Sequence, residues 1–178
     1  MTGQPSLFDE EPRYCIDTNV VVSFLRGTED EFYGADVFAI QWARIEELMG
    51  NGGIVAPRQV EQELLAWDRA IEGMASWVRS HRRMFFDVEM SAQLQSAKRI
   101  VNAYPAYASN TNYLGDLSVI TLADCMGIAV LTLEGRKETN SKKRPKIPNV
   151  CQEFGIDCVS VTGFLRREGF GRRPTDGG

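Results

Sequence analysis

Apolar residues along the chain fall into two patterns, short continuous runs and stripes with a spacing of three to four residues. Continuous runs predict buried strands, and stripes predict helices that bury one face. The continuous runs lie at residues 14–16, 54–56 and 128–133, and residues 157–161, which contain polar positions, are predicted as a final strand. The run at 128–133 is apolar almost throughout, which is typical of a central parallel strand.

Helical stripes separate these runs. They are predicted at residues 18–25, 37–49, 58–67, 71–82, 90–107, 116–126, 150–154 and 164–168. The helix at 90–107 is expected to break near Pro105. In the helix at 37–49, the expected buried stripe consists of Val37, Ile40, Ile45 and Leu48. The alternation of strands and helices predicts an α/β fold with a mainly parallel sheet.

The length of 178 residues suits one hydrophobic core, so we expect a single domain over residues 13–170. Residues 1–12 and 171–178 are rich in polar residues and glycine or proline, and we expect both ends to be disordered. The first residues lack an apolar targeting segment, and no apolar run is long enough to cross a bilayer. These features predict a cytoplasmic protein with no membrane partner.

Residue counts exclude several classes of enzyme. The chain has one histidine, His81, in a polar segment expected at the surface, so zinc sites built on HExxH are absent. The glycine-rich signatures of dinucleotide-binding and P-loop proteins are also missing, as is the GxSxG motif. The four cysteines lack CxxC spacing and are expected to be reduced, buried thiols. Any catalytic chemistry must therefore come from carboxylates.

Two acidic residues stand at the carboxyl ends of predicted strands. Asp17 follows the run at 14–16, and Glu134 follows the run at 128–133. In open parallel sheets, functional groups gather beyond these ends, so both carboxylates enter one crevice if the strands are neighbours. The alternative for Asp17 is a capping role, because Asp commonly accepts a hydrogen bond from the first turn of a helix.

Two further acids lie on predicted helices. Glu63 shares the apolar stripe of Val60 and Trp67, which places it on the inward face, where a carboxylate needs a cation or another partner. Asp116 begins a helix whose inward face contains Ile120, so it is also expected to point into the crevice. Capping is an equally good interpretation of Asp116 taken alone.

Four carboxylates in one crevice would repel one another, and their pKa values would rise unless a cation neutralised them. Oxygen ligands without histidine or thiolate favour Mg²⁺ or Mn²⁺ over zinc. Such ions activate water and stabilise charge on the leaving oxygen of a phosphodiester. The sequence therefore predicts a phosphodiester-cleaving site whose catalytic and metal-binding residues are Asp17, Glu63, Asp116 and Glu134.

The ordered set of these motifs resembles the PIN-domain nuclease superfamily, in particular the toxins of the VapC type. The similar segments are the strand and Asp-Thr-Asn at residues 14–19, Ile-Val-Ala-Pro at 54–57 leading to Glu63, Leu-Gly-Asp at 114–116, and Thr-Leu-Glu at 132–134. The resemblance spans roughly residues 13–165. It implies a PIN-like three-layer sandwich with a central, mainly parallel sheet flanked by helices, and an Mg²⁺- or Mn²⁺-dependent endoribonuclease activity.

The same resemblance implies supporting roles and partners. Asn19 and Thr132 would support or orient the four acids. The protein would be the toxin of a type II toxin–antitoxin pair, with RNA as its substrate, a cognate antitoxin protein as its inhibitor, and a homodimer as a possible assembly. Glu134 stands where most of these proteins have Asp, and the loop after it is unusually long. The long loop resembles a divergent PIN-like branch that is also linked to toxin–antitoxin pairs.

The long loop, residues 135–148, is strongly basic. It contains six basic residues and one acidic residue, so its net charge is +5, whereas the overall charge of the chain is −4. The basic residues are Arg136, Lys137, Lys142, Lys143, Arg144 and Lys146. Beside Glu134 they are expected to bind RNA phosphates, which sets position and affinity without reading sequence. A merely solvated loop is the alternative.

Two other functions compete with a ribonuclease. A metal site built from the same acids could also cleave DNA, so one alternative is a structure-selective DNA nuclease. The chain has no recognisable DNA-binding module, which disfavours it. A PIN-like module that binds RNA or a protein partner without cutting is the other alternative, and the glutamate at position 134 allows it.

Overall fold

The computed structural model describes residues 10–87 and 90–171. Within them, four short strands form one sheet in the order β2-β1-β3-β4, and each neighbouring pair is parallel. The strands are β1 (Tyr14–Ile16), β2 (Ile54–Val55), β3 (Ala129–Thr132) and β4 (Cys158–Ser160). The predicted parallel sheet is confirmed.

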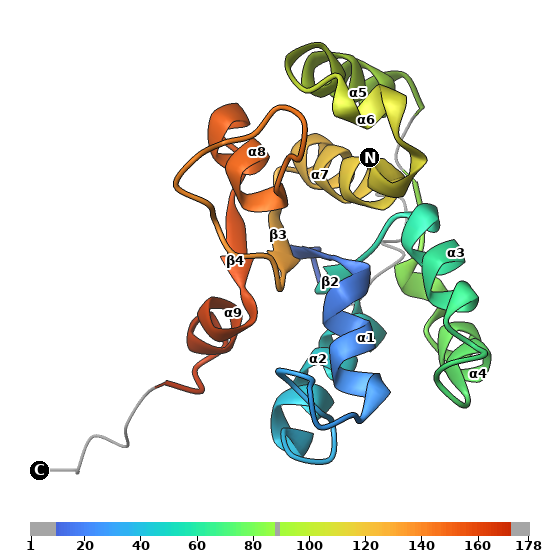
Figure 1. The fold of residues 1–178 in the computed structure, drawn as a ribbon. Coiled ribbons are helices and arrows are strands. Elements are labelled where there is room, and N and C mark those ends of the chain that lie inside the picture. Colours follow the sequence, from blue (N-terminus) through green and yellow to red (C-terminus); the bar gives the residue numbers. More distant parts are fainter. Residues whose placement is uncertain (1–9, 88–89, 172–178) are drawn as a thin grey trace, which may run out of the picture.

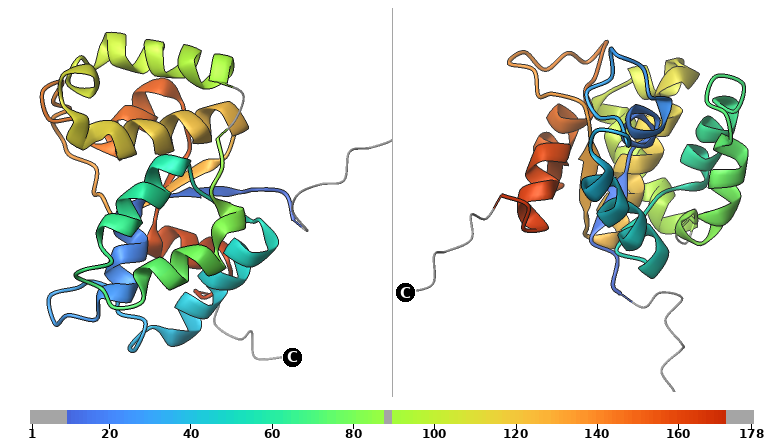
Figure 2. Two further views of the ribbon diagram at one scale, coloured as in Figure 1. Left: turned by 90° about the vertical axis from the view of Figure 1, so that its right-hand side faces the viewer. Right: turned by 90° about the horizontal axis from the view of Figure 1, so that it is seen from below.

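Helices cover both faces of this sheet (Figure 1). They are α1 (Thr18–Arg26), α2 (Ala39–Asn51), α3 (Arg58–Ala66), α4 (Met74–Ser80), α5 (Met90–Ala103), α6 (Ala106–Ser109), α7 (Leu114–Met126), α8 (Ile147–Phe154) and α9 (Val161–Arg167), with 3₁₀ turns η1 (Arg82–Met84) and η2 (Thr111–Tyr113). In Figure 1, α5 to α8 lie above the sheet, and α1, α2 and α9 lie below it. Figure 2 shows the same layers from the side. This three-layer α/β arrangement confirms the expected fold class.

The central strands are buried on both faces, as their apolar runs predict. Every residue of β1, β2 and β3 is buried, and β1 and β3 lie side by side in the middle of the sheet. Helix α7 packs on both of these strands, and α3 contacts both α7 and α1. Helix α3 therefore links the two helical layers.

Helix α2 buries only part of the stripe that the sequence predicts. Val37 and Ile40 are each 74% exposed, whereas Ile45 and Leu48 are fully buried. Val37 precedes the helix, and Ile40 lies five residues before Ile45, which places it nearly opposite the buried face. Trp42 fills the inward position instead. The expected stripe was therefore half wrong.

Helix α8 begins earlier than expected. The sequence predicts a loop as far as Pro148, but the helix starts at Ile147. Proline fits the first turn of a helix, because the backbone N–H that it lacks would have no partner within the helix there. This early start brings the end of the basic loop to the N-terminus of α8.

The expected disordered ends fall mostly on residues 1–9 and 172–178, which lie outside the described residues. The backbone N–H of Glu10 donates to Asn51, so the start of the described chain contacts the end of α2. No helix in the described ranges is long and apolar enough to span a membrane. The four cysteines are free thiols, with Cys15 and Cys151 buried.

Candidate functional site

The ends of β1 and β3 meet at one edge of the sheet. Ile16 pairs with Leu131, and the next backbone N–H, that of Asp17, donates to the Leu131 carbonyl at 2.9 Å. The Thr132 hydroxyl then donates to Asp17 Oδ2 at 3.0 Å and accepts from the Glu134 N–H at 3.1 Å. The two strands are neighbours, which was the condition for Asp17 and Glu134 to meet, and Thr132 links the residues that follow them.

Asp17 is a buried carboxylate without a capping role. It is 2% exposed and occupies the N-cap position of α1, yet its side chain makes no capping hydrogen bond. Burial raises the pKa of Asp17 to about 6, and the charges of Glu134 and Glu63 contribute to the rise. The hydrogen bond from Thr132 acts in the opposite direction. Asp17 therefore faces the site, and the Thr18 backbone at the start of α1 also lowers its pKa.

Glu63 reaches the same region from α3. Its neighbours Val60 and Leu64 are fully buried, as its position on the inward stripe predicts. Glu63 Oε2 accepts a hydrogen bond from the Thr18 hydroxyl at 2.6 Å. The carboxylate lies against Gly115 at the start of α7, where an added Cβ would overlap it. Gly115 thus permits the close approach of Glu63 to α7.

Asp116 comes from the first turn of α7. The helix begins at Leu114, so Asp116 lies inside it, and Tyr113 holds the N-cap position. The capping interpretation is therefore wrong for Asp116. Burial is the largest cause that raises the pKa of Asp116 to about 8. Neighbouring carboxylates add to this rise: those of Asp17, Glu134 and Glu63.

Three of the four predicted acids open onto one cavity of about 300 Å³. It is lined by Asp17, Thr18, Asn19, Glu63, Ala66, Trp67, Asn112 and Asp116. The acids come from the end of β1, from α3 and from α7, which are distant in sequence. The fold brings them to the carboxyl edge of the sheet, where parallel α/β proteins bind ligands.

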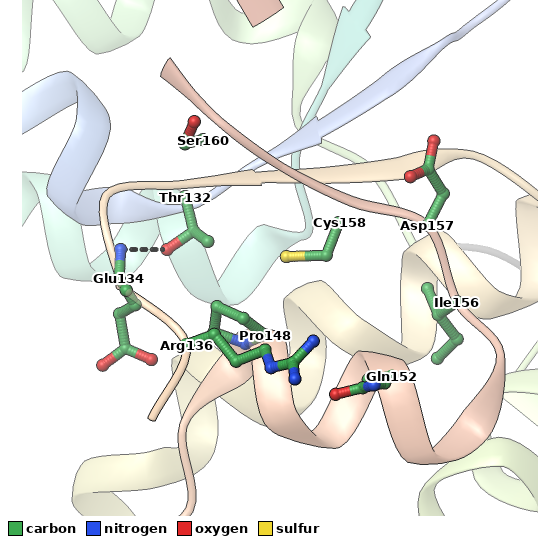
Figure 3. A pocket seen from close by; sticks show the side chains of 10 residues that line it. Thr132, Glu134, Arg136, Pro148, Gln152, Ile156, Asp157, Cys158 and Ser160 are labelled. Atoms are coloured by element: carbon green, nitrogen blue, oxygen red, sulfur yellow. Dashed lines mark hydrogen bonds between the residues drawn. The ribbon is translucent and has the colours of Figure 1, made fainter. Parts of the chain in front are cut away.

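Glu134 is directed elsewhere. Its Oε1 lies 2.5 Å from Lys146 Nζ, and its Oε2 accepts the backbone N–H of Ile147 at 2.8 Å. Together with Thr132, it lines a second cavity of about 430 Å³ beside β4. Figure 3 shows these two residues at one end of that cavity. The charge of Glu134 thus acts on Asp17 and Asp116, but its side chain does not line their cavity.

The first cavity is lined by the oxygen-bearing side chains that hard divalent cations prefer. In the described ranges, no three His, Cys, Asp or Glu side chains lie close enough together to hold a metal ion. Each of two carboxylates has its own hydroxyl donor, Thr132 for Asp17 and Thr18 for Glu63. The cavity nonetheless offers three carboxylates with amide and hydroxyl oxygens and no nitrogen or sulfur ligand from histidine or cysteine. This donor set fits a hard cation such as Mg²⁺ or Mn²⁺.

Three residues of this site have no role assigned from the sequence: Thr18 and Gly115, which stand only as members of the similar motifs, and Asn112. Thr18 directly follows Asp17, and this adjacency was the available signal for it. Asn112 lies in η2, and nothing in the local pattern marks it. Gly115 is significant only because Glu63 packs against it from another helix. Of the two expected supporting residues, Thr132 contacts Asp17, and Asn19 is exposed at the rim of the cavity.

The basic loop divides into two groups of side chains. Lys146 is paired with Glu134, and Lys142 lies 2.9 Å from Glu153 and over the ring of Tyr104. The others are exposed and form no ion pair in the described part of the chain: Arg136, Lys137, Lys143 and Arg144. Only this second group is freely available to phosphates.

The comparisons with known proteins bear on the family alone. None of the curated proteins compared with the chain matches it. A protein-family model described as "Domain of unknown function (DUF4411)" matches residues 14–171, which include both cavities and all four acids. The chain belongs to the DUF4411 family.

Proposed function

We propose that this protein is a metal-dependent endoribonuclease with a PIN-like active site. The observation that carries the proposal is the convergence of Asp17, Glu63 and Asp116 on one cavity at the carboxyl edge of the sheet. Two of these carboxylates have raised pKa values. Carboxylates with raised pKa values cluster at functional sites, because charges removed from water are costly unless the site uses them.

The chain's own residues have distinct roles in this proposal. Asp17, Glu63 and Asp116 would hold Mg²⁺ or Mn²⁺, and Thr132 and Thr18 orient Asp17 and Glu63. When bound, such an ion supplies Lewis-acid activation of water and of the phosphodiester. The RNA phosphate is itself an anion, so a cationic surface beside the acids would offset their repulsion as the RNA approaches the bound ion.

The exposed basic side chains of the loop provide that surface. Arg136, Lys137, Lys143 and Arg144 carry charge without internal ion pairs in the described chain, so they can contact RNA phosphates. Figure 1 shows the loop between β3 and α8, which follows directly from the strand next to Asp17.

The biological role within the proposal follows the PIN-like resemblance. We assign the protein to the toxins of type II toxin–antitoxin systems, acting on cytoplasmic RNA. A cognate antitoxin protein would inhibit it by covering the acidic cavity or displacing the metal ion. A homodimer is compatible with this assignment.

The experiment that tests the nuclease proposal compares substrates and metal ions. Purified protein is incubated with mixed-sequence single-stranded RNA, or with DNA of the same sequence, in Mg²⁺, Mn²⁺ or EDTA. We expect cleavage of RNA in either metal and none in EDTA. The Glu63→Gln variant should lose this cleavage, and Glu61→Gln, two residues away and paired with Arg58, should retain it. Cleavage of DNA alone would identify a DNA nuclease instead.

One observation favours a second candidate, a binding module that does not cut. Lys146 already neutralises Glu134, so one of the four acids has a protein partner. In that case RNA binding would persist in EDTA, and no condition would produce cleavage.

A further inference from the structure

Both carboxylate oxygens of Glu134 already have partners. Lys146 Nζ lies 2.5 Å from Oε1, and the Ile147 N–H donates to Oε2 at 2.8 Å. The Glu134 side chain is only 17% exposed, and that of Lys146 is 39% exposed. The contact is therefore a partly buried, two-point interaction rather than a surface ion pair.

The backbone around Lys146 and the backbone around Glu134 both hold this ion pair in place. Lys146 holds the N-cap position of α8 in extended conformation, and Ile147 begins the helix. The first N–H groups of a helix lack partners within it and carry partial positive charge, so they favour a carboxylate. At the other end, the Glu134 N–H is held by Thr132. Glu134 thus serves as the anion at the start of α8.

A second clamp holds the ends of the loop together. The Lys137 N–H donates to Asn149 Oδ1 at 3.0 Å, and Asn149 Nδ2 donates to the Lys137 carbonyl at 2.8 Å. Asn149 is buried in the first turn of α8. Because this clamp lies beside the Glu134–Lys146 pair, the lysine is held next to the acids by the closure of the loop.

Lys146 brings one positive charge to the group of acids. Its charge acts on Asp116 as well as on Glu134, whereas Asp17 and Glu63 have no lysine or arginine partner in the described chain. A cation bound directly to Glu134 would have to displace the ammonium group and break the contact with the helix start. Two positive charges that share one carboxylate repel each other.

We infer that Lys146 is a resident cation that takes the place of a second metal ion, so that the site binds a single divalent ion through Asp17, Glu63 and Asp116. The inference rests on the proposed function and sharpens its metal site. In this inference Glu134 binds Lys146 and the first N–H of α8, and it is not a metal ligand. Lys146 is a positioning residue, because it acts through Glu134.

The test counts Mn²⁺ ions bound to the full chain by titration calorimetry and by electron paramagnetic resonance of free Mn²⁺. We expect one Mn²⁺ in the wild-type protein and none in Asp17→Asn. Glu134→Gln should keep one ion with a Kd changed by less than about threefold, whereas loss of a true ligand or its support costs about 10- to 100-fold. Two ions in the wild-type protein, or a tenfold loss in Glu134→Gln, would overturn the inference.

Variants at Lys146 provide a second readout. Lys146→Met frees Glu134, so a second, weaker Mn²⁺ should bind, and it should vanish in the double variant with Glu134→Gln. Lys146→Arg retains the charge and should bind one ion, as should the exposed control Lys143→Met. An unchanged single ion in folded Lys146→Met, checked by circular dichroism, would contradict the resident-cation role.

The outcomes separate this inference from the nuclease proposal. One Mn²⁺ that requires Asp17, in a protein that cuts no RNA, would support the single-ion site and refute the nuclease. RNA cleavage with two bound ions would support the nuclease and refute the role of Lys146. Absence of any Asp17-dependent Mn²⁺ binding would refute both.

Discussion

Thr132 donates a hydrogen bond to Asp17 at 3.0 Å, joining the last residue of β3 to the carboxylate that follows β1. Both residues are buried, with exposed fractions of 1% and 2%. A buried carboxylate needs such donors, since burial alone disfavours its charged form. The contact depends on the parallel pairing of two strands that are more than a hundred residues apart.

Replacing Thr132 tests this relationship. Thr132→Val removes the donor while keeping the shape, so we expect a loss of about 1–3 kcal/mol in the free energy of unfolding at neutral pH. Thr132→Ser keeps the hydroxyl and should lose less. Urea denaturation followed by tryptophan fluorescence measures both. Equal stability of the Val and Ser variants would show that the hydroxyl does not support Asp17.

The raised pKa values of the acids predict how stability depends on pH in the metal-free protein. The pKa is about 6 for Asp17 and about 8 for Asp116, both above the ordinary value of 3.8. Between the ordinary and raised values the folded state binds more protons than the unfolded state, so these groups lower stability as pH rises. In EDTA, their effect reduces the free energy of unfolding progressively from about pH 4 to pH 8.

The Asp116→Asn variant isolates this effect. It should be more stable than the wild-type protein at pH 8 in EDTA, and the difference should shrink toward pH 4, because the repelled charge is absent. Exposed Asp30 provides the control, since Asp30→Asn should leave the wild-type pH dependence unchanged. Urea unfolding at several pH values provides the measurement. A variant less stable than the wild-type protein at pH 8 would argue against burial of an uncompensated charge.

The sequence predicted the parts of this structure that depend on local pattern. Continuous apolar runs located the strands, and the strand-end positions of Asp17 and Glu134 follow from them. The inward face of α3, with Glu63 near its centre, also follows from spacing. These features are set by residues close together in the chain.

The remaining features depend on contacts between distant segments. Ile40 has the hydrophobic character of a core residue, but the geometry of α2 leaves it exposed. Glu134 pairs with Lys146 because a loop closes and α8 starts early, and neither event follows from the residue types. For the same reason, local pattern could not show that Lys142 and Lys146 have acidic partners within the chain.

Gly115 offers a steric test of the packing between α3 and α7. An added methyl group would overlap the Glu63 carboxylate, so Gly115→Ala should push Glu63 away from the cavity. We expect Mn²⁺ affinity to fall by about tenfold or more, as when a ligand loses its support. The control is Gly135→Ala, where a Cβ has open space around it. Equal Mn²⁺ affinity in the two variants would place Glu63 outside the metal site.

The exposed basic side chains of the loop predict a specific salt dependence of RNA binding. Neutralising Arg136, Lys137, Lys143 and Arg144 together should lower the slope of log affinity against log salt by about 0.7 for each lost phosphate contact. Lys142 and Lys146 are left intact because they have acidic partners. The control replaces exposed basic residues elsewhere: Arg69, Arg79, Arg82 and Lys98. A slope equal to that of the control would make the loop an ordinary solvated surface.

Asp17, Glu63 and Asp116 form the proposed site for a divalent ion that supports RNA cleavage. The most direct test is single-turnover cleavage of RNA by the wild-type protein and by Asp17→Asn, in Mn²⁺ and in EDTA, at saturating enzyme. We expect cleavage by the wild-type protein in Mn²⁺ only, and a rate at least about a hundredfold lower for a folded Asp17→Asn variant, because metal stabilisation supplies several kcal/mol. Equal rates for the two proteins in Mn²⁺, or wild-type cleavage that persists in EDTA, would contradict this proposal.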